Sequence, residues 1–233
     1  MNTLNEYFKK NHEPKNFTHK PVEKQPDLLT ETINGKRFYV LPNGEKLPSI
    51  TTVLSARGNE GIARWRASVG EQVANTIMRN AARRGTAVHT LTENYLNNEE
   101  LTQQGVLPTA LFTILKTELD KINNIVIQEG SLYSSKWGVA GRVDCIAEYD
   151  GKLSVIDFKT STKDKKEEWV ENYFIQTSAY CEMFEEQYGQ AIDQIVILIV
   201  TEEGGTQTFI KNKNDYLPLL KPAIEEFHKK FQN

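Results

Sequence analysis

Hydrophobic and polar positions alternate along this chain with two different periods, which predict where helices and strands lie. Between residues 61 and 96 an apolar stripe recurs about every 3.6 residues, as expected for one side of a helix, at Ile77, Ala81, Val88, Leu91 and Tyr95. Gly70 and Gly85 interrupt this pattern. A shorter helix is expected from Pro48-Ser49 onward, with Ser49 as its N-cap and Ile50, Val53 and Leu54 on its apolar side.

The remaining segments complete the predicted order of elements. Further helices are expected over residues 108–124, 167–188 and 215–231. Strands are expected over residues 37–41, 125–134, 140–149, 152–159, 193–201 and 206–210, with a turn at Asn43-Gly44 after the first of them. This order of helices, three strands, helix, two strands and helix predicts an α/β or α+β fold around one mixed sheet.

The polarity of the first 30 residues predicts a separate segment. Residues 1–30 are expected to form a flexible tail, or an arm that orders only on a partner. Residues 31–233 are expected to form a single domain, with a mainly helical part at about 48–124 and a sheet core at about 125–233.

Charge and cysteine content narrow the function. The 28 basic and 31 acidic residues give a net charge of −3, which argues against a general DNA-coating protein but not against a nuclease with acidic metal ligands. Two cysteines, Cys145 and Cys181, are too few for a disulfide framework or a four-cysteine iron–sulfur cluster. No secretory signal and no apolar run of about 18 residues is visible, so we expect a reducing cytoplasm and no membrane span.

Asp150-Gly151 predicts a tight hairpin between two strand-like segments. In that hairpin Tyr149 faces Lys152, and the same register places Asp144 opposite Asp157 with Cβ atoms about 4.5–5.5 Å apart. Lys159 follows on the same face, because side chains alternate along a strand. Ile146, Leu153 and Val155 share this face, so the carboxylates stand at the end of an apolar surface.

Two opposed carboxylates repel each other unless a cation compensates, and oxygen ligands suit Mg²⁺ or Mn²⁺. A metal held by Asp144 and Asp157, with Lys159 beside it, could hydrolyse a phosphodiester bond. The alternative interpretation is a solvated pair of acids on an exposed strand end. A longer turn with a bulge would also shift the register and separate the pair.

These residues resemble the PD-(D/E)XK nuclease superfamily, in its RecB-like branch. Residues 141–144 (Gly-Arg-Val-Asp) match the G-x-x-D motif, and Asp157-Phe158-Lys159 matches the D-x-K motif. Val143 stands where the family name places a proline. Gln176 and Tyr180 match the Q-x-x-x-Y of this branch, and Gly85 to His89 matches the G-x-x-x-H of nucleases similar to mitochondrial genome maintenance exonucleases.

The resemblance implies a restriction-endonuclease-like α/β core, in which a central mixed sheet is flanked by helices and preceded by a helical extension. It implies catalytic roles for Asp144, Asp157 and Lys159, with Mg²⁺ or Mn²⁺ bound by His89, Asp144, Asp157 and the backbone carbonyl of Phe158. Gly85 would then allow close packing on the sheet. Supporting roles are implied for Glu93, Glu129, Gln176 and Tyr180. DNA contacts are expected from Ser49, Thr51, Arg64, Arg83, Arg84 and Thr160.

The resemblance favours a free-standing DNA exonuclease of replication, recombination or repair, in a bacterial or phage-infected cell. If the early helices arch over the site, a threaded single-stranded end would be the preferred substrate. Replication or recombination proteins would then be partners. The alternatives are a structure-specific endonuclease on the same core and a non-catalytic DNA-binding module, although both aspartates and the lysine are retained. Cleavage polarity, RNA as substrate and oligomeric state stay open.

Overall fold

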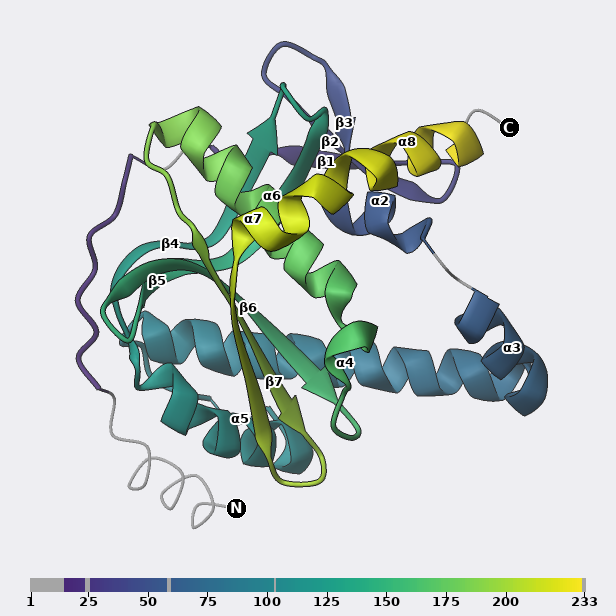
Figure 1. The fold of residues 1–233 in the computed structure, drawn as a ribbon. Helices are drawn as coiled ribbons and strands as arrows, with labels where there is room; N and C mark the ends of the chain where they lie inside the picture. Colours follow the sequence, from purple (N-terminus) through teal and green to yellow (C-terminus); the bar gives the residue numbers. More distant parts are fainter. Residues whose placement is uncertain (1–14, 24–25, 58–59, 103, 232–233) are drawn as a thin grey trace.

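A five-stranded sheet forms the centre of the computed structural model, which describes residues 15–23, 26–57, 60–102 and 104–231 (Figure 1). Its strands are β4 (Ile122–Ser134), β5 (Val139–Tyr149), β6 (Lys152–Ser161), β7 (Gln194–Thr201) and β8 (Thr206–Asn212). They lie side by side in sequence order. Only the β6–β7 pair is parallel, so the sheet is mixed, as predicted.

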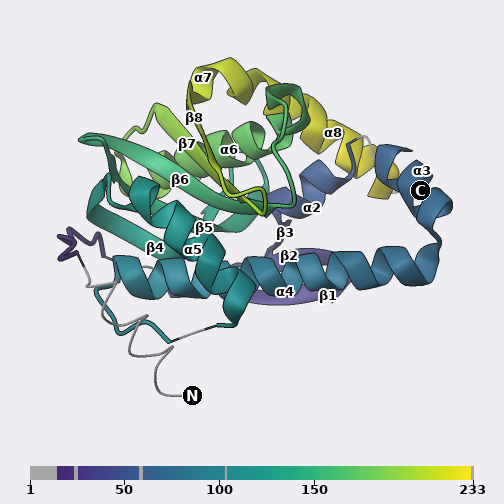
Figure 2. The same cartoon turned by 90° about the horizontal axis from the view of Figure 1, so that it is seen from below.

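Helices cover both faces of this sheet (Figures 1 and 2). One face carries α6 (Glu171–Tyr188), and the other carries α4 (Glu71–Leu96) and α5 (Val106–Leu119). β7 shows why both faces are apolar: Ile195, Ile197 and Ile199 enter the core under α6, whereas the alternate residues Val196, Leu198 and Val200 enter the core under α4 and α5. The predicted α/β architecture is therefore confirmed.

A small second sheet precedes the helices and was only partly predicted. It consists of β1 (Leu29–Ile33), β2 (Lys36–Val40) and β3 (Lys46–Pro48), all antiparallel. Asn34 and Gly35 both have positive φ angles, 50° and 71°, which suit the tight turn between β1 and β2. The predicted turn at Asn43-Gly44 is present within the β2–β3 connection.

The described part of the expected N-terminal tail packs on the domain. Phe17 is buried, and its ring meets Tyr95 edge-on with centroids 5.0 Å apart. The backbone of Thr18 and Lys20 bonds to both polar groups of Ile125 at the edge of β4. The packing contradicts a flexible tail for the described residues 15–23, because an apolar anchor and an unpaired strand edge hold this segment. Residues 1–14 lie outside the described residues.

Glycine conformation decides where the long helical stretch breaks. Gly70, with a φ of 85°, separates α3 (Glu60–Val69) from α4, whereas Gly85 lies inside α4 without interrupting it. α4 extends past the sheet toward α3 (Figure 2). Val88, Leu91 and Tyr95 of the predicted stripe are buried, but Ile77 is 46% exposed because it precedes the part of α4 that lies on the sheet.

Other helix boundaries differ from prediction by short irregular turns. The helix expected over 108–124 ends at Leu119, because Ile122 already pairs with Tyr149 in β4. The helix expected over 167–188 begins with η1 (Glu167–Trp169). The last expected helix divides into α7 (Lys213–Tyr216), η2 (Leu217–Leu219) and α8 (Leu220–Phe231). Among the described helices, none is long and apolar enough to cross a membrane.

Candidate active site

The β5–β6 hairpin has the register that Asp150-Gly151 predicts. Tyr149 pairs with Lys152 and Ile146 with Val155, and the last pair is Cys145 with Ile156. Asp144 and Asp157 lie one step beyond this last pair. There the Oδ2 atom of Asp144 accepts a hydrogen bond from the backbone N–H of Phe158, at 2.9 Å. The two carboxylates therefore lie where the pairing of β5 with β6 ends, and there a backbone N–H group of β6 binds a side chain of β5.

Asp157 and Lys159 form a tightly held ion pair on the side of β6 that faces α6. Asp157 is 1% exposed, and its Oδ2 atom contacts the ammonium group of Lys159. Its Oδ1 atom accepts a hydrogen bond from the side-chain amide of Gln176 on α6, at 3.0 Å. The ammonium nitrogen also lies 5.1 Å from the centroid of the Tyr173 ring. Lys159 is thus fixed between a carboxylate and an aromatic face.

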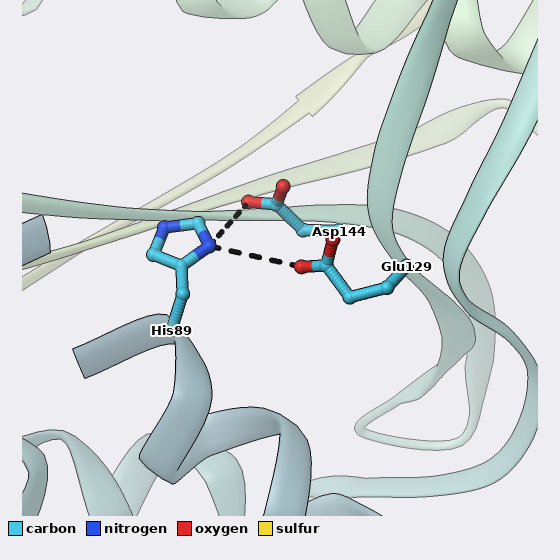
Figure 3. A group of neighbouring side chains, drawn as sticks. All are labelled: His89, Glu129 and Asp144. Carbon is cyan, nitrogen blue, oxygen red and sulfur yellow. Dashed lines mark ion pairs between the residues drawn. The ribbon is translucent and has the colours of Figure 1, made fainter. Parts of the chain in front are cut away.

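His89 on α4 faces two carboxylates from neighbouring strands (Figure 3). Its Nδ1 atom lies 3.8 Å from Oε1 of Glu129 on β4 and 3.9 Å from Oδ2 of Asp144 on β5. The Nε2 atom lies 2.8 Å from the backbone carbonyl of Phe158. A carbonyl oxygen only accepts hydrogen bonds, so the Nε2 atom carries a proton. When the ring is neutral, the Nδ1 atom therefore has a lone pair, which points toward the two carboxylates.

Glu129 reaches this group through an unusual backbone conformation. The β4–β5 pairs on either side are Gln128 with Cys145 and Gly130 with Val143, so Glu129 lies across from Asp144. Its φ angle is 47°, a left-handed conformation that costs a non-glycine residue about 1–3 kcal/mol and is frequent at functional sites. The resemblance implied a supporting role for Glu129, but the sequence did not place it across from Asp144, because the loop before β5 is not a two-residue turn that sets a register.

The buried charges change one another's protonation. Burial disfavours a charged His89, but Glu129 and Asp144 outweigh this effect and raise the imidazole pKa to about 9. Burial and the charge of Asp157 raise the pKa of Asp144 to about 6. Burial also opposes the charge of Lys159, yet the attraction of Asp157 and Asp144 raises its pKa above the usual value. Without a metal, His89 is therefore expected to be protonated at neutral pH.

A cavity of about 550 Å³ opens in front of Asp144 and Lys159. Four other predicted residues line it, namely Ser49, Thr51, Gln176 and Tyr180. The hydroxyl group of Ser49 already has a structural role. As the N-cap of α2 (Ile50–Ser55), it accepts a hydrogen bond from the backbone N–H of Thr52. Six further lining residues were not among the predicted site residues: Arg37, Tyr39, Arg57, Arg142, Asn172 and Tyr173.

The structure does not bring every expected DNA-binding residue to this cavity. Arg64 and Arg83 are exposed on α3 and α4, and Arg84 pairs with Glu202. Thr160 lies beside Gly85 instead, where α4 passes β6. Their contribution to DNA binding stays a prediction. On the other side of His89, Glu93 and Glu129 line a smaller polar cavity of about 350 Å³.

Two glycines near the site differ in how closely they are packed. A Cβ atom on Gly141 would lie 2.6 Å from Cε1 and 2.8 Å from the hydroxyl oxygen of the buried Tyr180. A Cβ atom on Gly85 would meet only the hydroxyl of Thr160, at 3.7 Å, which is ordinary contact. Close packing thus requires glycine at position 141, whereas the close approach predicted at Gly85 leaves room for a methyl group.

Three side chains of the site offer ligand atoms that suit a divalent cation. One atom each from His89, Glu129 and Asp144 lies within 4.8 Å of the other two, and an imidazole nitrogen with carboxylate oxygens suits Mn²⁺ or Mg²⁺. Two predicted ligands stand outside this trio: Asp157 is engaged by Lys159 and Gln176, and the Phe158 carbonyl accepts from His89.

Comparison with known proteins agrees with this geometry. The model of the PD-(D/E)XK nuclease superfamily matches residues 100–232, more than half of the chain. The chain belongs to the PD-(D/E)XK nuclease superfamily. Asp144, Asp157 and Lys159, the predicted motif residues of this PD-(D/E)XK protein, lie close together where the pairing of β5 with β6 ends. The family assignment supports a hydrolytic nuclease.

Two individual proteins resemble this PD-(D/E)XK chain. Human mitochondrial genome maintenance exonuclease 1 is 27% identical over 130 residues, which cover 51% of this chain and 38% of the human protein. The chain therefore matches well under half the length of that relative. A crystal structure of a candidate exonuclease from Eubacterium rectale superposes with a TM-score of 0.43 and 15% identity, over 64% of this chain and 66% of the other.

Proposed function

We propose that this protein is a divalent-metal-dependent DNA exonuclease that hydrolyses phosphodiester bonds from single-stranded ends. The observation that carries this proposal is that the Asp157–Lys159 pair lies beside the His89–Glu129–Asp144 group, with Asp144 and Lys159 lining a cavity. The name of the human relative supports exonuclease action. A role in replication, recombination or repair, with protein partners in a bacterial or phage-infected cytoplasm, stays a prediction.

His89, Glu129 and Asp144 would hold the metal, with Asp157 and the Phe158 carbonyl beside them. A bound divalent cation supplies a Lewis acid for the phosphate and lowers the pKa of a water ligand. The ammonium group of Lys159 would stabilise negative charge on the phosphate in the transition state. Gln176 keeps Asp157 oriented toward Lys159, and Tyr173 limits the positions open to the ammonium group. Glu93, Tyr180 and the cavity hydroxyls would support the site and the bound strand.

Cleavage assays on linear and closed circular single-stranded DNA test this proposal. With Mg²⁺ or Mn²⁺ we expect the linear strand to disappear and the circle to survive, because an exonuclease needs an end. EDTA should stop the reaction. Lys159→Ala should be inactive, whereas Lys152→Ala, at the distant hairpin turn, should cleave normally. Cutting of the circle would favour a structure-specific endonuclease, and binding without cleavage under either metal would favour a DNA-binding module.

A further inference from the structure

The cavity in front of Asp144 has a basic wall that neither the predicted ligands nor the predicted DNA contacts include. Arg37, Arg57, Arg142 and Lys159 line it, against the single carboxylate of Asp144. A cavity with this excess of cations attracts a phosphate chain. The question is which cations are free to bind one.

Three of the four cations already have carboxylate partners. Lys159 contacts Asp157, and Arg57 lies 3.2 Å from Glu171. Arg142 donates from Nε to Glu129 at 2.9 Å, and its Nη1 atom lies 3.8 Å from Asp27. These pairs hold the walls of the cavity together and partly neutralise the charges.

Arg37 differs from these three. In the described chain no carboxylate pairs with its exposed guanidinium group. The acidic residues near the small sheet are used elsewhere: Asp27 faces Arg142, and Glu31 pairs with Lys46 at 2.6 Å. Glu31 lies opposite Phe38 in the β1–β2 register, so it is on the other face of the sheet from Arg37.

The backbone of Arg37 is nevertheless tied to the active-site strand. Its carbonyl accepts a hydrogen bond from the N–H of Ser49, at 2.9 Å, and Ser49 forms a bridge with Ala140 of β5. Tyr39, two residues further along β2, faces the same side and is buried in the cavity wall. The guanidinium group of Arg37, which pairs with no carboxylate of the described residues, therefore stands on a strand that is anchored to β5 through Ser49.

We propose that Arg37 binds a phosphodiester group of the DNA strand, next to the phosphate that is positioned at Asp144 and Lys159. The small sheet β1–β3 then forms a strand-binding wall of the cavity. A guanidinium group can bind a phosphate through two parallel hydrogen bonds, which fixes the strand without reading its sequence. The inference rests on the proposed nuclease function, since it names a substrate contact of that same site.

Equilibrium binding of a fluorescent oligothymidylate in EDTA tests the proposal without any cleavage. For Arg37→Ala we expect a dissociation constant about tenfold higher than for the wild type. The slope of log affinity against log salt should become shallower by about 0.7, the value for one phosphate contact on a single strand. Arg37→Lys should keep most of the slope, because it keeps the charge. Lys152→Ala removes one exposed charge at the far end of the hairpin and should change neither quantity.

A neutral linkage in the DNA identifies the phosphate itself. A single uncharged methylphosphonate linkage is placed at each position of the DNA strand in turn. At the position that Arg37 contacts, this linkage should weaken binding by the wild type but cause no further loss of binding by Arg37→Ala. Thermal melting of each variant checks that it is folded. If Arg37→Ala disturbs the fold, Arg37→Gln takes its place.

An Arg37→Ala salt slope equal to that of Lys152→Ala would overturn the phosphate contact. If the wild type still cleaves single-stranded DNA in that case, only this inference fails. A wild type that neither binds nor cleaves DNA would overturn the proposed function, and the strand-binding wall with it.

Discussion

The two ends of the β5–β6 hairpin are built from the same two strands but do different things. Near Asp150-Gly151 every residue pairs, and the side chains alternate into the two apolar cores. Beyond the Cys145–Ile156 pair lie the charged residues Asp144, Asp157 and Lys159, and Asp157 is buried. Burying a charge is costly unless it is paired, so this end, which we propose carries the chemistry, is expected to lower the stability of the fold. The paired end supplies the rigidity that holds it.

Lys159→Ala is the largest expected change at the polar end. Removing a group that stabilises transition-state charge typically lowers the rate by about 10²–10³-fold, and we expect that loss in single-turnover cleavage. Thermal melting should remain cooperative at a somewhat lower temperature, because Asp157 keeps its hydrogen bond from Gln176. Cleavage within tenfold of wild type would show that the ammonium group is dispensable.

Ile146→Ala makes the opposite test at the paired end. Ile146 is fully buried against Val155, so the cavity left by truncation should lower the free energy of unfolding by about 2–5 kcal/mol, measured by urea denaturation. Below the unfolding transition, the cleavage rate per folded molecule should stay close to wild type. A loss of rate as large as that of Lys159→Ala would mean that the two ends are not separable.

Gly141→Ala asks whether packing also constrains the polar end. The new methyl group would overlap Tyr180, so we expect destabilisation by about 1–3 kcal/mol. Gly85→Ala is the matched control, because its methyl group has room and alanine is favoured inside a helix by about 0.5–1 kcal/mol. Chemical denaturation of both variants should give changes of opposite sign. Equal destabilisation would contradict the packing described here.

Metal affinity should depend on pH in a direction set by His89. Its pKa of about 9 means that the ring is protonated at neutral pH without metal, and binding through Nδ1 must displace that proton. Affinity for Mn²⁺ should therefore rise with pH up to about 9, by at most about tenfold per unit for one proton. Calorimetry at three pH values measures this, with His89→Ala as the control. A flat profile from pH 6.5 to 8.5 would exclude His89 as a ligand.

Tyr173→Leu should have the smallest effect. The ring face stabilises the ammonium position of Lys159 by about 0.5–2 kcal/mol, so we expect kcat to fall several-fold while KM stays near wild type. Tyr173→Phe keeps the ring and should restore kcat. If both variants lose the same activity, the hydroxyl group matters and not the ring face.

The sequence predicted the hairpin and its two aspartates because a two-residue turn sets the register by counting. The order of the main strands and the Ser49 cap followed from equally local signals. Glu129 could be placed across from Asp144 only with the β4–β5 pairing known, and its backbone conformation is a property of the folded strand.

Other features depended on what lies nearby in space. Ile77 continues the apolar stripe of α4, yet its side chain is 46% exposed. Arg37 lies over a hundred positions before Asp144 in sequence, and its strand reaches the site through the Ser49–Ala140 bridge and the packing of Tyr39 near Ala140. The sequence shows that one side of a helix is apolar or that a residue is charged, but it does not show which part of the fold faces that side or that residue.

Three consecutive residues of β6 join the layers of the molecule. Asp157 and Lys159 face α6, while Phe158 packs under α4 and holds His89 through its carbonyl. An insertion or deletion of one residue between Gly151 and Asp157 would reverse which face of the sheet each following side chain points to. A phenylalanine would then face α6 where a carboxylate faces it now. We therefore expect natural length variation to be confined to loops such as residues 162–166, while the stretch from Cys145 to Lys159 keeps a constant length.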